Sequence, residues 1–254
     1  MDRSAGIVVI GNEILSGKVV DTNSSFLARE LRKMGVDLRR VAVISDDLEE
    51  IATTVREFHR AFDLVFTSGG VGPTHDDVTI EGIARAFGRR VVREPELERK
   101  LRDFYKEKVN DARLKMSEVP EGAELIYGGT VAFPTLKIEN VYILPGIPEI
   151  LQSKFLTIRE RFTGAPFHLR IVYTREGEGA IAEFLNDTLR SFPELMLGSY
   201  PKIGDPEYVV KLTLESKDRD YVERAFAHLL RILPDGCVVK TETPEEEATC
   251  EDGS

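Results

Sequence analysis

The chain is poor in the residues that build disulfide frameworks and zinc sites. Its 254 residues include two cysteines and four scattered histidines, which are Cys237, Cys250, His59, His75, His168 and His228. The two cysteines lack the spacing of metal ligands, and so few thiols exclude a disulfide framework and indicate a reducing, cytoplasmic environment. The scatter of the histidines argues against a histidine-rich zinc site.

Long apolar runs are absent as well. Charged residues interrupt the first twenty positions, beginning with Asp2 and Arg3, so we expect no secretory signal segment. No later stretch approaches the roughly 20 apolar residues that span a bilayer, and we expect no membrane partner. With 42% hydrophobic and 31% charged residues, the composition is typical of a soluble globular protein long enough for two domains.

Positive charge is scarce relative to negative charge. The formal net charge is −10, and residues 241–254 hold six acidic residues but no lysine or arginine. We expect residues 242–254 to form a disordered acidic tail, or alternatively a tail that recruits a partner. About −4 then remains on the folded part, which argues against a nucleic-acid partner. The basic residues of segment 93–115 alternate with acidic ones, as on a solvated helix face.

Residues 1–163 alternate apolar runs with amphipathic stretches. Strands are predicted at 6–10, 36–44, 63–67 and 140–145, with helices at 23–35, after Asp46 or Asp47, and at 78–87. This alternation predicts an α/β domain with a layered, mostly parallel sheet. Ligands bind beyond the carboxyl ends of strands in such sheets, so we expect Gly11, residues 68–72 and residues 145–148 to converge.

The pattern changes after the sequence Gly-Ala-Pro at 164–166. Residues 164–241 read strand, helix, strand, strand, helix, strand. This βαββαβ order is typical of a small ferredoxin-like or KH-type module of roughly 75 residues. We expect a hinge near Pro166.

The segment TSGGVGPTHDDVT, residues 67–79, carries the densest chemical signal. Its glycines, Gly69, Gly70 and Gly72, can adopt positive φ and let backbone N–H groups approach a ligand closely. Because they join a strand to a helix, the N–H groups and the helix N-terminus face the same place, which favours an anion. The alternative is a tight turn that needs glycine.

Asp76 and Asp77 follow these glycines directly. Carboxylates beside a phosphate repel it unless a cation intervenes, so the pair predicts a divalent metal (Mg²⁺, Mn²⁺ or Co²⁺) bound to a phosphate or pyrophosphate ester. The alternative is that one of the two acids caps the helix. His75 beside them is expected to contact the ligand or to be an ordinary loop residue.

Other residues at the same strand ends are candidates for the site. The segment GNEILSG begins with Gly11 and contains Glu13. The segment DTN ends with Asn23, and Asn23 or Thr22 could instead cap the next helix. Asp46 follows a predicted strand and has the same alternative. In PGIPE, Gly146 permits a close approach and Pro148 begins a helix.

These motifs resemble a known family. TSGGVGPTHDDVTIE and LPGIPE are similar to the signatures of the MoaB/Mog molybdopterin-binding fold. Together with GNEILSG and DTN they resemble the amino-terminal domain of CinA proteins and, more closely, the molybdopterin-binding-like domain of eukaryotic FAD synthases. Residues 198–216 resemble the small second module of the same proteins. The resemblance implies a three-layer α/β fold and a homo-oligomer.

The resemblance also implies an activity. CinA-type relatives hydrolyse the pyrophosphate of ADP-ribose with a divalent metal, the FAD-synthase relative is associated with FAD hydrolysis, and molybdopterin relatives transfer an adenylyl group. Asp77 and Asp46 match the family's two functional aspartates. Asp76 stands where adenylyl-transferring relatives carry a basic residue, which favours the CinA type. Neither a deamidase nor an FAD-synthesising domain is recognisable, so we expect neither activity.

The sequence therefore predicts a metal-dependent hydrolase of a small nucleotide substrate, ADP-ribose or FAD, that releases AMP. The alternatives are pterin binding with adenylyl transfer and a non-catalytic nucleotide-binding protein. The predicted catalytic residues are Asp77, Asp46 and Asp76, and the predicted metal ligands are Asp76 and Asp77. The predicted substrate-binding residues are Ser68, Gly69, Gly70, Gly72, Thr74, Gly11, Glu13, Asn23, Pro145 and Gly146.

Overall fold

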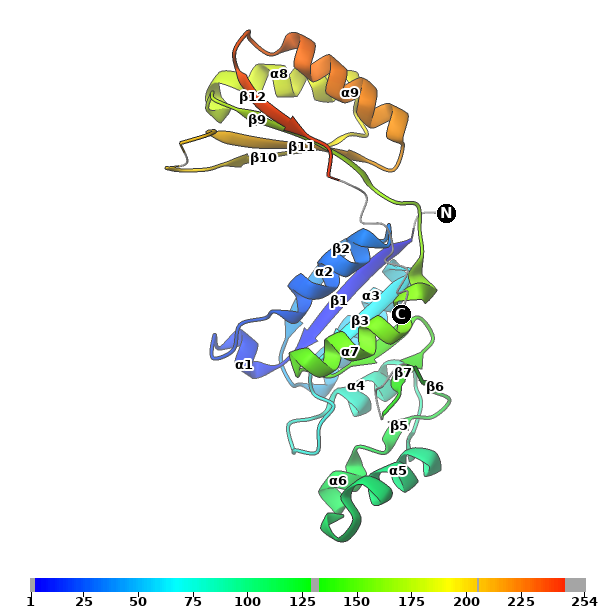
Figure 1. Cartoon of the computed structure of the whole chain (residues 1–254). Helices are drawn as coiled ribbons and strands as arrows, with labels where there is room; N and C mark the ends of the chain where they lie inside the picture. The colour runs from blue at the N-terminus through cyan, green and yellow to red at the C-terminus, as the bar shows by residue number, and fades with distance from the viewer. Residues whose placement is uncertain (1–2, 129–132, 205, 245–254) are drawn as a thin grey trace, which may run out of the picture. The chain divides into compact units, whose positions relative to one another are not determined.

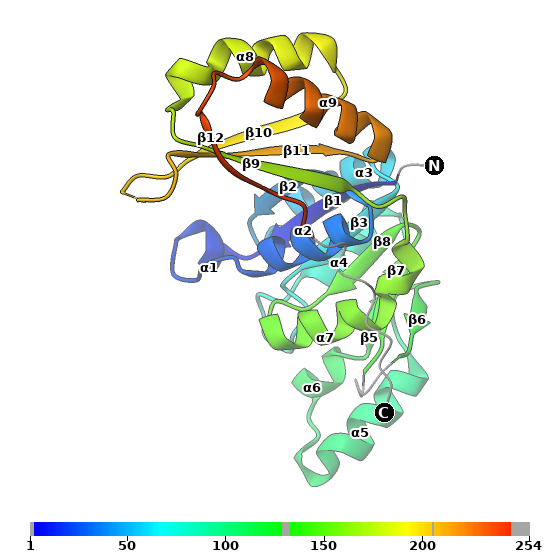
Figure 2. The ribbon, with the colours of Figure 1, turned by 45° about the horizontal axis from the view of Figure 1, so that its top comes forward.

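The computed structural model describes residues 3–128, 133–204 and 206–244, and its ribbon is shown in Figures 1 and 2. The chain divides into two compact units, Met1–Ala165 and Pro166–Ser254. Each unit has its own sheet and its own hydrophobic core. Across the described residues, no helix is both long enough and apolar enough to cross a membrane.

The first unit is an α/β domain. Its strands are β1 (Ser4–Ile10), β2 (Asp37–Ile44), β3 (Leu64–Ser68), β4 (Val91–Arg93), β5 (Glu118–Pro120), β6 (Glu124–Ile126), β7 (Thr135–Ile138) and β8 (Val141–Leu144). Its helices are α1 (Asn12–Leu15), α2 (Asn23–Lys33), α3 (Leu48–Ala61), α4 (Thr79–Ala86), α5 (Pro95–Tyr105), α6 (Asp111–Lys115) and α7 (Pro148–Ile158). Short 3-10 turns follow α5 and α7.

Six of these strands form one sheet, in the order β2-β1-β3-β8-β7-β6. The first four run parallel to one another, whereas β7 and β6 are antiparallel to their neighbours. The predicted α/β class with a mostly parallel sheet is confirmed, although the antiparallel edge was not among the predicted strands. Strands β4 and β5 form a separate antiparallel ribbon.

Helices cover both faces of this sheet, which gives the domain three layers (Figure 1). On one face, α2 and α7 bury a core in which Phe155 and Phe162 meet Phe66 of β3 edge to face. On the other face, α3 and α4 bury a second core that contains Val55 and Ile83. Every residue of β3 is buried between these layers, so the loop that leaves β3 starts from a rigid position.

Local signals in the sequence explain the helix boundaries near the site. Gly35, at φ 72°, follows the end of α2. Asp47 caps α3, because its carboxylate accepts hydrogen bonds from the N–H groups of Glu49 and Glu50. Pro148 occupies the first turn of α7, as predicted.

The second unit contains β9 (His168–Thr174), α8 (Glu178–Ser191), β10 (Met196–Pro201), β11 (Val210–Ser216), α9 (Arg219–Ile232) and β12 (Val238–Glu242). Its strands form an antiparallel sheet in the order β10-β11-β9-β12, which places the last strand beside the first. Both helices contribute to a core with Val172 and Leu212 from the sheet. The predicted βαββαβ module is therefore confirmed.

The boundary of the acidic tail needs a correction. The sequence places Glu242 in the tail, but Glu242 is the last residue of β12, where its carboxylate accepts a hydrogen bond from the Tyr173 hydroxyl at 2.8 Å. Lys240 forms an ion pair with the same carboxylate at 3.3 Å. The other acidic residues assigned to the tail, within 245–254, lie outside the described residues.

Candidate functional site

The carboxyl ends of β1, β2, β3 and β8 meet at one edge of the sheet. The N–H of Gly11, after β1, donates to the carbonyl of Ile44 at the end of β2 at 3.1 Å. The N–H of Gly69, after β3, donates to the carbonyl of Leu144 at the end of β8 at 3.2 Å. A Cβ at Gly146 would lie 3.3 Å from the Cα of Gly69. The structure thus brings together the three strand ends that the sequence singles out.

The first two glycines of the loop after β3 are required by packing. Gly69 has φ 107°, and a Cβ there would lie 2.1 Å from the carbonyl oxygen of Ile10. Gly70 has φ 63°, and a Cβ there would lie 2.3 Å from Oγ1 of Thr79. Thr79 fixes the turn, because its hydroxyl donates to the Gly69 carbonyl at 2.9 Å and its N–H donates to the Gly70 carbonyl at 3.0 Å.

The backbone amides of the same loop form a row of donors. In the part of the chain that the structure describes, the N–H groups of Gly70, Val71 and Gly72 donate to no protein acceptor. All three residues are partly exposed, so a ligand can reach them. Pro73, which has no N–H, ends the row. The packing of Gly69 and Gly70 supports the tight-turn interpretation. Consecutive amide donors of this kind favour an anion, and the anion site stays a prediction.

Asn23 joins two of the converging loops. Its Nδ2 donates to Oγ of Ser68 at 2.9 Å and to the carbonyl of Gly146 at 2.8 Å, in the turn that Pro145 begins after β8. The carbonyl can only accept, which fixes the orientation of the amide. The Ser68 oxygen accepts this bond in a buried position, since Ser68 is 1% exposed. The side chain of Asn23 does not cap α2, so the capping alternative is wrong.

The Oδ1 atom of Asn23 is buried and has no partner among the described residues, and the same holds for Oγ of Ser24. Buried polar atoms normally have partners. The unpaired acceptor of Asn23, beside the converging loops, is consistent with a polar ligand or an ordered water at this edge.

Asn23→Leu is expected to lower the free energy of unfolding of the first unit by about 1–3 kcal/mol, because the Ser68 oxygen loses its donor in a buried position. Urea denaturation followed by circular dichroism measures the change. Asn12→Leu is the matched control, because Asn12 is exposed and its side chain makes no hydrogen bond among the described residues. An equal loss in both variants would contradict the bridging role.

Asp77 closes the glycine loop. Its Oδ2 accepts a hydrogen bond from the Thr74 N–H at 2.8 Å and another from the Thr74 hydroxyl. A Cβ at Gly72 would lie 2.6 Å from the same oxygen, so the carboxylate lies against the row of amides. Helix α4 begins only at Thr79 and has no side-chain cap, and the prediction that one of the two acids caps it is wrong.

Asp76 and His75 lie on the outside of the loop. The side chain of Asp76 is 62% exposed and that of His75 is 98% exposed. The Thr74 hydroxyl lowers the pKa of the Asp76 carboxyl, with smaller contributions from the Asp76 backbone amide, His75 and Lys115, although this hydroxyl donates its hydrogen to Asp77. Asp76 therefore stays ionised at neutral pH.

Lys115 is the residue near the loop that the sequence did not predict. It ends α6, and its Nζ donates to the carbonyls of Thr74 and Asp77, each at 2.9 Å. The alternating charges of segment 93–115 gave no sign of this contact, since they indicate only a solvated helix face. The spacing between Lys115 and the loop also hides it from any local pattern.

Asp46 faces the loop after β1. Its Oδ2 accepts a hydrogen bond from the Asn12 N–H at 2.8 Å, so Asp47, and not Asp46, caps α3. The carboxylate of Glu13 bends back over Gly11, where a Cβ would lie 2.5 Å from Oε1. Both acids thus lie against the loop after β1, and β1 separates β2 from the strand that carries the glycine loop.

Oxygen ligands suited to Mg²⁺ or Mn²⁺ are present, but they do not form a closed metal site. Among the described residues, no group of three or more His, Cys, Asp or Glu side chains is arranged to hold a metal ion. Asp77 accepts a hydrogen bond from Thr74, whereas the side chain of Asp76 is exposed. The two predicted ligands therefore have different surroundings. Mg²⁺ commonly binds one or two carboxylates together with substrate phosphates and water, and this donor set fits that arrangement.

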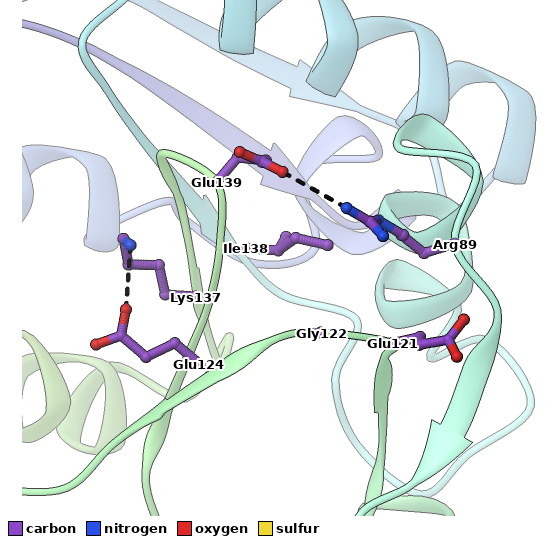
Figure 3. A pocket seen from close by; sticks show the side chains of 7 residues that line it. All are labelled: Arg89, Glu121, Gly122, Glu124, Lys137, Ile138 and Glu139. Atoms are coloured by element: carbon purple, nitrogen blue, oxygen red, sulfur yellow. Dashed lines mark hydrogen bonds and ion pairs between the residues drawn. The ribbon is translucent and has the colours of Figure 1, made fainter.

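A polar pocket lies at the other edge of the sheet (Figure 3). It surrounds the turn between β7 and β8, whereas the glycine loop lies at the opposite end of β8. Its charges are paired: Arg89 with Glu139 at 3.9 Å and Lys137 with Glu124 at 3.1 Å. None of the predicted site residues lines it.

Comparison with known families matches both units. Residues 6–162 match the family described as "Probable molybdopterin binding domain", and residues 166–242 match "FAD synthase, middle domain". The chain is 37% identical over 229 residues to a protein of Archaeoglobus fulgidus, covering 90% of this chain and 97% of that protein.

A second relative is much longer than this chain. The chain is 33% identical over 262 residues to a protein of Caenorhabditis elegans named "Probable FAD synthase", covering 91% of this chain and 50% of that protein. Among solved structures, the protein CinA of Thermoplasma acidophilum, described as having unknown function, is 32% identical with a TM-score of 0.59. That similarity covers 63% of this chain and 98% of the other.

Proposed function

We propose that this chain, which belongs to the family of probable molybdopterin-binding domains, is a hydrolase of nucleotide pyrophosphates. The substrate is ADP-ribose or FAD. The oxygen of water adds to one phosphorus and the bridging oxygen leaves with the other phosphate. The products are AMP and a second monophosphate, which is ribose 5-phosphate or FMN, and two protons are released when both products are dianions.

The observation that carries this proposal is the row of amides at Gly70, Val71 and Gly72, with the Asp77 carboxylate against it. The amides bind the oxygens of one phosphate, and the buried Ser68 supports the start of the loop through its bond with Asn23. A phosphate bound here lies beside carboxylates that repel it, so the site suits a substrate that arrives with a cation.

Asp77 and Asp76 are the residues that would hold a divalent metal together with the phosphate oxygens. A metal in that place supplies a Lewis acid and lowers the pKa of a bound water. Asp46 follows β2, which β1 separates from β3, and its second carboxylate oxygen can accept a proton from a water beside the loop after β1. Gly146, held by Asn23, allows the substrate to approach the backbone closely.

The relatives support a nucleotide substrate without fixing it. The chain spans about half the length of the nematode protein named a probable FAD synthase, so the activity of that whole protein is not transferred. The match of residues 166–242 to the FAD synthase middle domain supports a flavin nucleotide as one candidate substrate. The family description favours a second candidate, which is pterin binding with adenylyl transfer from ATP.

A substrate panel tests the proposal. The purified chain is incubated with FAD, ADP-ribose and ATP, each with Mg²⁺, Mn²⁺, Co²⁺ or EDTA, and the products are separated by chromatography. AMP from FAD or ADP-ribose that disappears with EDTA is the expected result. AMP from either substrate at the same rate in EDTA contradicts the role of the metal.

Two other results would replace the proposal. ATP consumed only in the presence of a pterin favours adenylyl transfer. Binding of the dinucleotides by calorimetry without any product favours a non-catalytic nucleotide-binding protein.

A further inference from the structure

Lys115 reaches the Thr74–Asp77 turn from a distant part of the chain. The two residues whose carbonyls it contacts lie 41 and 38 positions earlier in the sequence. The same two residues are joined by the Asp77 carboxylate and the Thr74 N–H. Lys115 therefore holds both ends of the turn that carries the two acids.

The backbone that carries Lys115 is well anchored. Asn110 caps α6 by accepting a hydrogen bond from the Arg113 N–H at 2.9 Å. Leu114, which precedes Lys115 in the sequence, is buried. Ser117, two residues after Lys115, is also buried, and its hydroxyl donates to the Leu114 carbonyl at 2.6 Å. The side chain of Lys115 thus leaves a fixed frame, so its contact with the loop limits where the loop lies.

The charge of Lys115 is not neutralised by an ion pair. Nowhere in the described residues does a carboxylate lie within ion-pair distance of its Nζ. The two carbonyls occupy two of the three ammonium hydrogens, which leaves one donor. A pyrophosphate that approaches Asp76 and Asp77 meets two negative charges, and a neighbouring ammonium lowers that repulsion.

We propose that Lys115 is a positioning residue of the hydrolysis site, which fixes the Thr74–Asp77 turn and offsets the negative charge that the pyrophosphate meets. This inference rests on the proposed function. Lys115 touches neither the substrate nor the reacting atoms in this arrangement. It acts through the two carbonyls and through its charge.

Lys115→Met tests the inference. We expect kcat/KM for the active dinucleotide to fall on the order of 10- to 100-fold, with kcat lowered by the displaced turn and KM raised by the lost charge. Lys115→Arg keeps the charge but changes the geometry, so it should restore KM more than kcat. Hydrogen exchange at residues 74–77 should be faster in Lys115→Met than in the unaltered chain.

Lys108→Met is the matched control, because it removes the same charge from the same exposed segment without contacting the loop. It is expected to keep kcat and KM within about twofold of the unaltered chain. If Lys115→Met keeps both parameters while Asp77→Asn is inactive, the inference is overturned and the proposed function stands. A loss confined to the melting temperature, with kcat and KM per folded molecule unchanged, also overturns it.

The unaltered chain distinguishes the two claims. If it neither binds nor hydrolyses FAD or ADP-ribose, the proposed function is overturned and the role of Lys115 with it. If it hydrolyses one of them and Lys115→Arg is as impaired as Lys115→Met in KM, the charge is irrelevant and the electrostatic half of the inference is overturned.

Discussion

Asp77→Asn is expected to lower the turnover of ADP-ribose or FAD by about 100-fold or more while the first unit stays folded. Asparagine has the same shape, and its carbonyl oxygen can still accept the hydrogen bonds that Thr74 donates. The turn therefore remains closed, and only the negative charge beside the row of amides is lost. Steady-state kinetics with Mg²⁺, Mn²⁺ and Co²⁺ measure the effect.

Two further variants separate charge from structure. Asp77→Ala removes the acceptor as well, so it should also lower the free energy of unfolding by about 1 kcal/mol. Asp76→Asn should cost less activity than Asp77→Asn, because Asp76 is exposed and does not close the loop. Turnover of Asp77→Asn within twofold of the unaltered chain would show that the glycine loop is not the hydrolytic site.

The parts of the fold that follow from local sequence are those with strong apolar or glycine signals. The apolar run of β3 is long enough to predict a buried strand, and the structure buries all of it. Gly35 is predicted to end α2 because glycine readily adopts the positive φ that it has there. Strands β6 and β7 are short, and neither alternates buried with exposed residues in the way that marks a half-buried strand. Their pairing in the sheet depends on contacts with β8 that no local pattern records.

Some features of the candidate site also follow from local sequence, and others depend on contacts between distant residues. The convergence of Gly11, Gly69 and Gly146 follows from the rule for parallel sheets, since each directly follows or neighbours a strand end. The role of Asn23 was ambiguous, because capping and bridging need the same side chain. The contact made by Lys115 could not be predicted from the sequence, because it depends on how the segment that contains α5 and α6 packs against the glycine loop.

The position at which α4 starts explains why neither Asp76 nor Asp77 caps it. The sequence is compatible with a helix that starts directly after the acids, but α4 starts at Thr79. Thr79 is held there by its bonds to the carbonyls of Gly69 and Gly70. The geometry of the glycine turn thus sets the start of the helix, and Asp77 is left to close the loop.

Gly69→Ala is expected to have the largest effect on stability. The added Cβ would lie 2.1 Å from the carbonyl oxygen of Ile10, which belongs to β1, a strand paired on both sides that cannot shift without disturbing the sheet. The backbone is also at φ 107°, a conformation that alanine rarely adopts. Strain and overpacking together should cost about 2–5 kcal/mol of unfolding free energy, measured by urea denaturation.

Gly17→Ala isolates the contribution of the contact. Gly17 also has positive φ, at 71°, but a Cβ there would meet nothing within 4 Å. It should cost only about 1–2 kcal/mol, which is the conformational penalty alone. The excess loss in Gly69→Ala then measures how tightly the loop is pressed against β1.

Because that contact positions the amides of Gly70 to Gly72, Gly69→Ala should also weaken binding of ADP-ribose, whereas Gly17→Ala should leave it unchanged. Equal stability of the two variants would mean that the loop can move away from β1. The row of amides would then not be rigid, which contradicts its proposed role in phosphate binding.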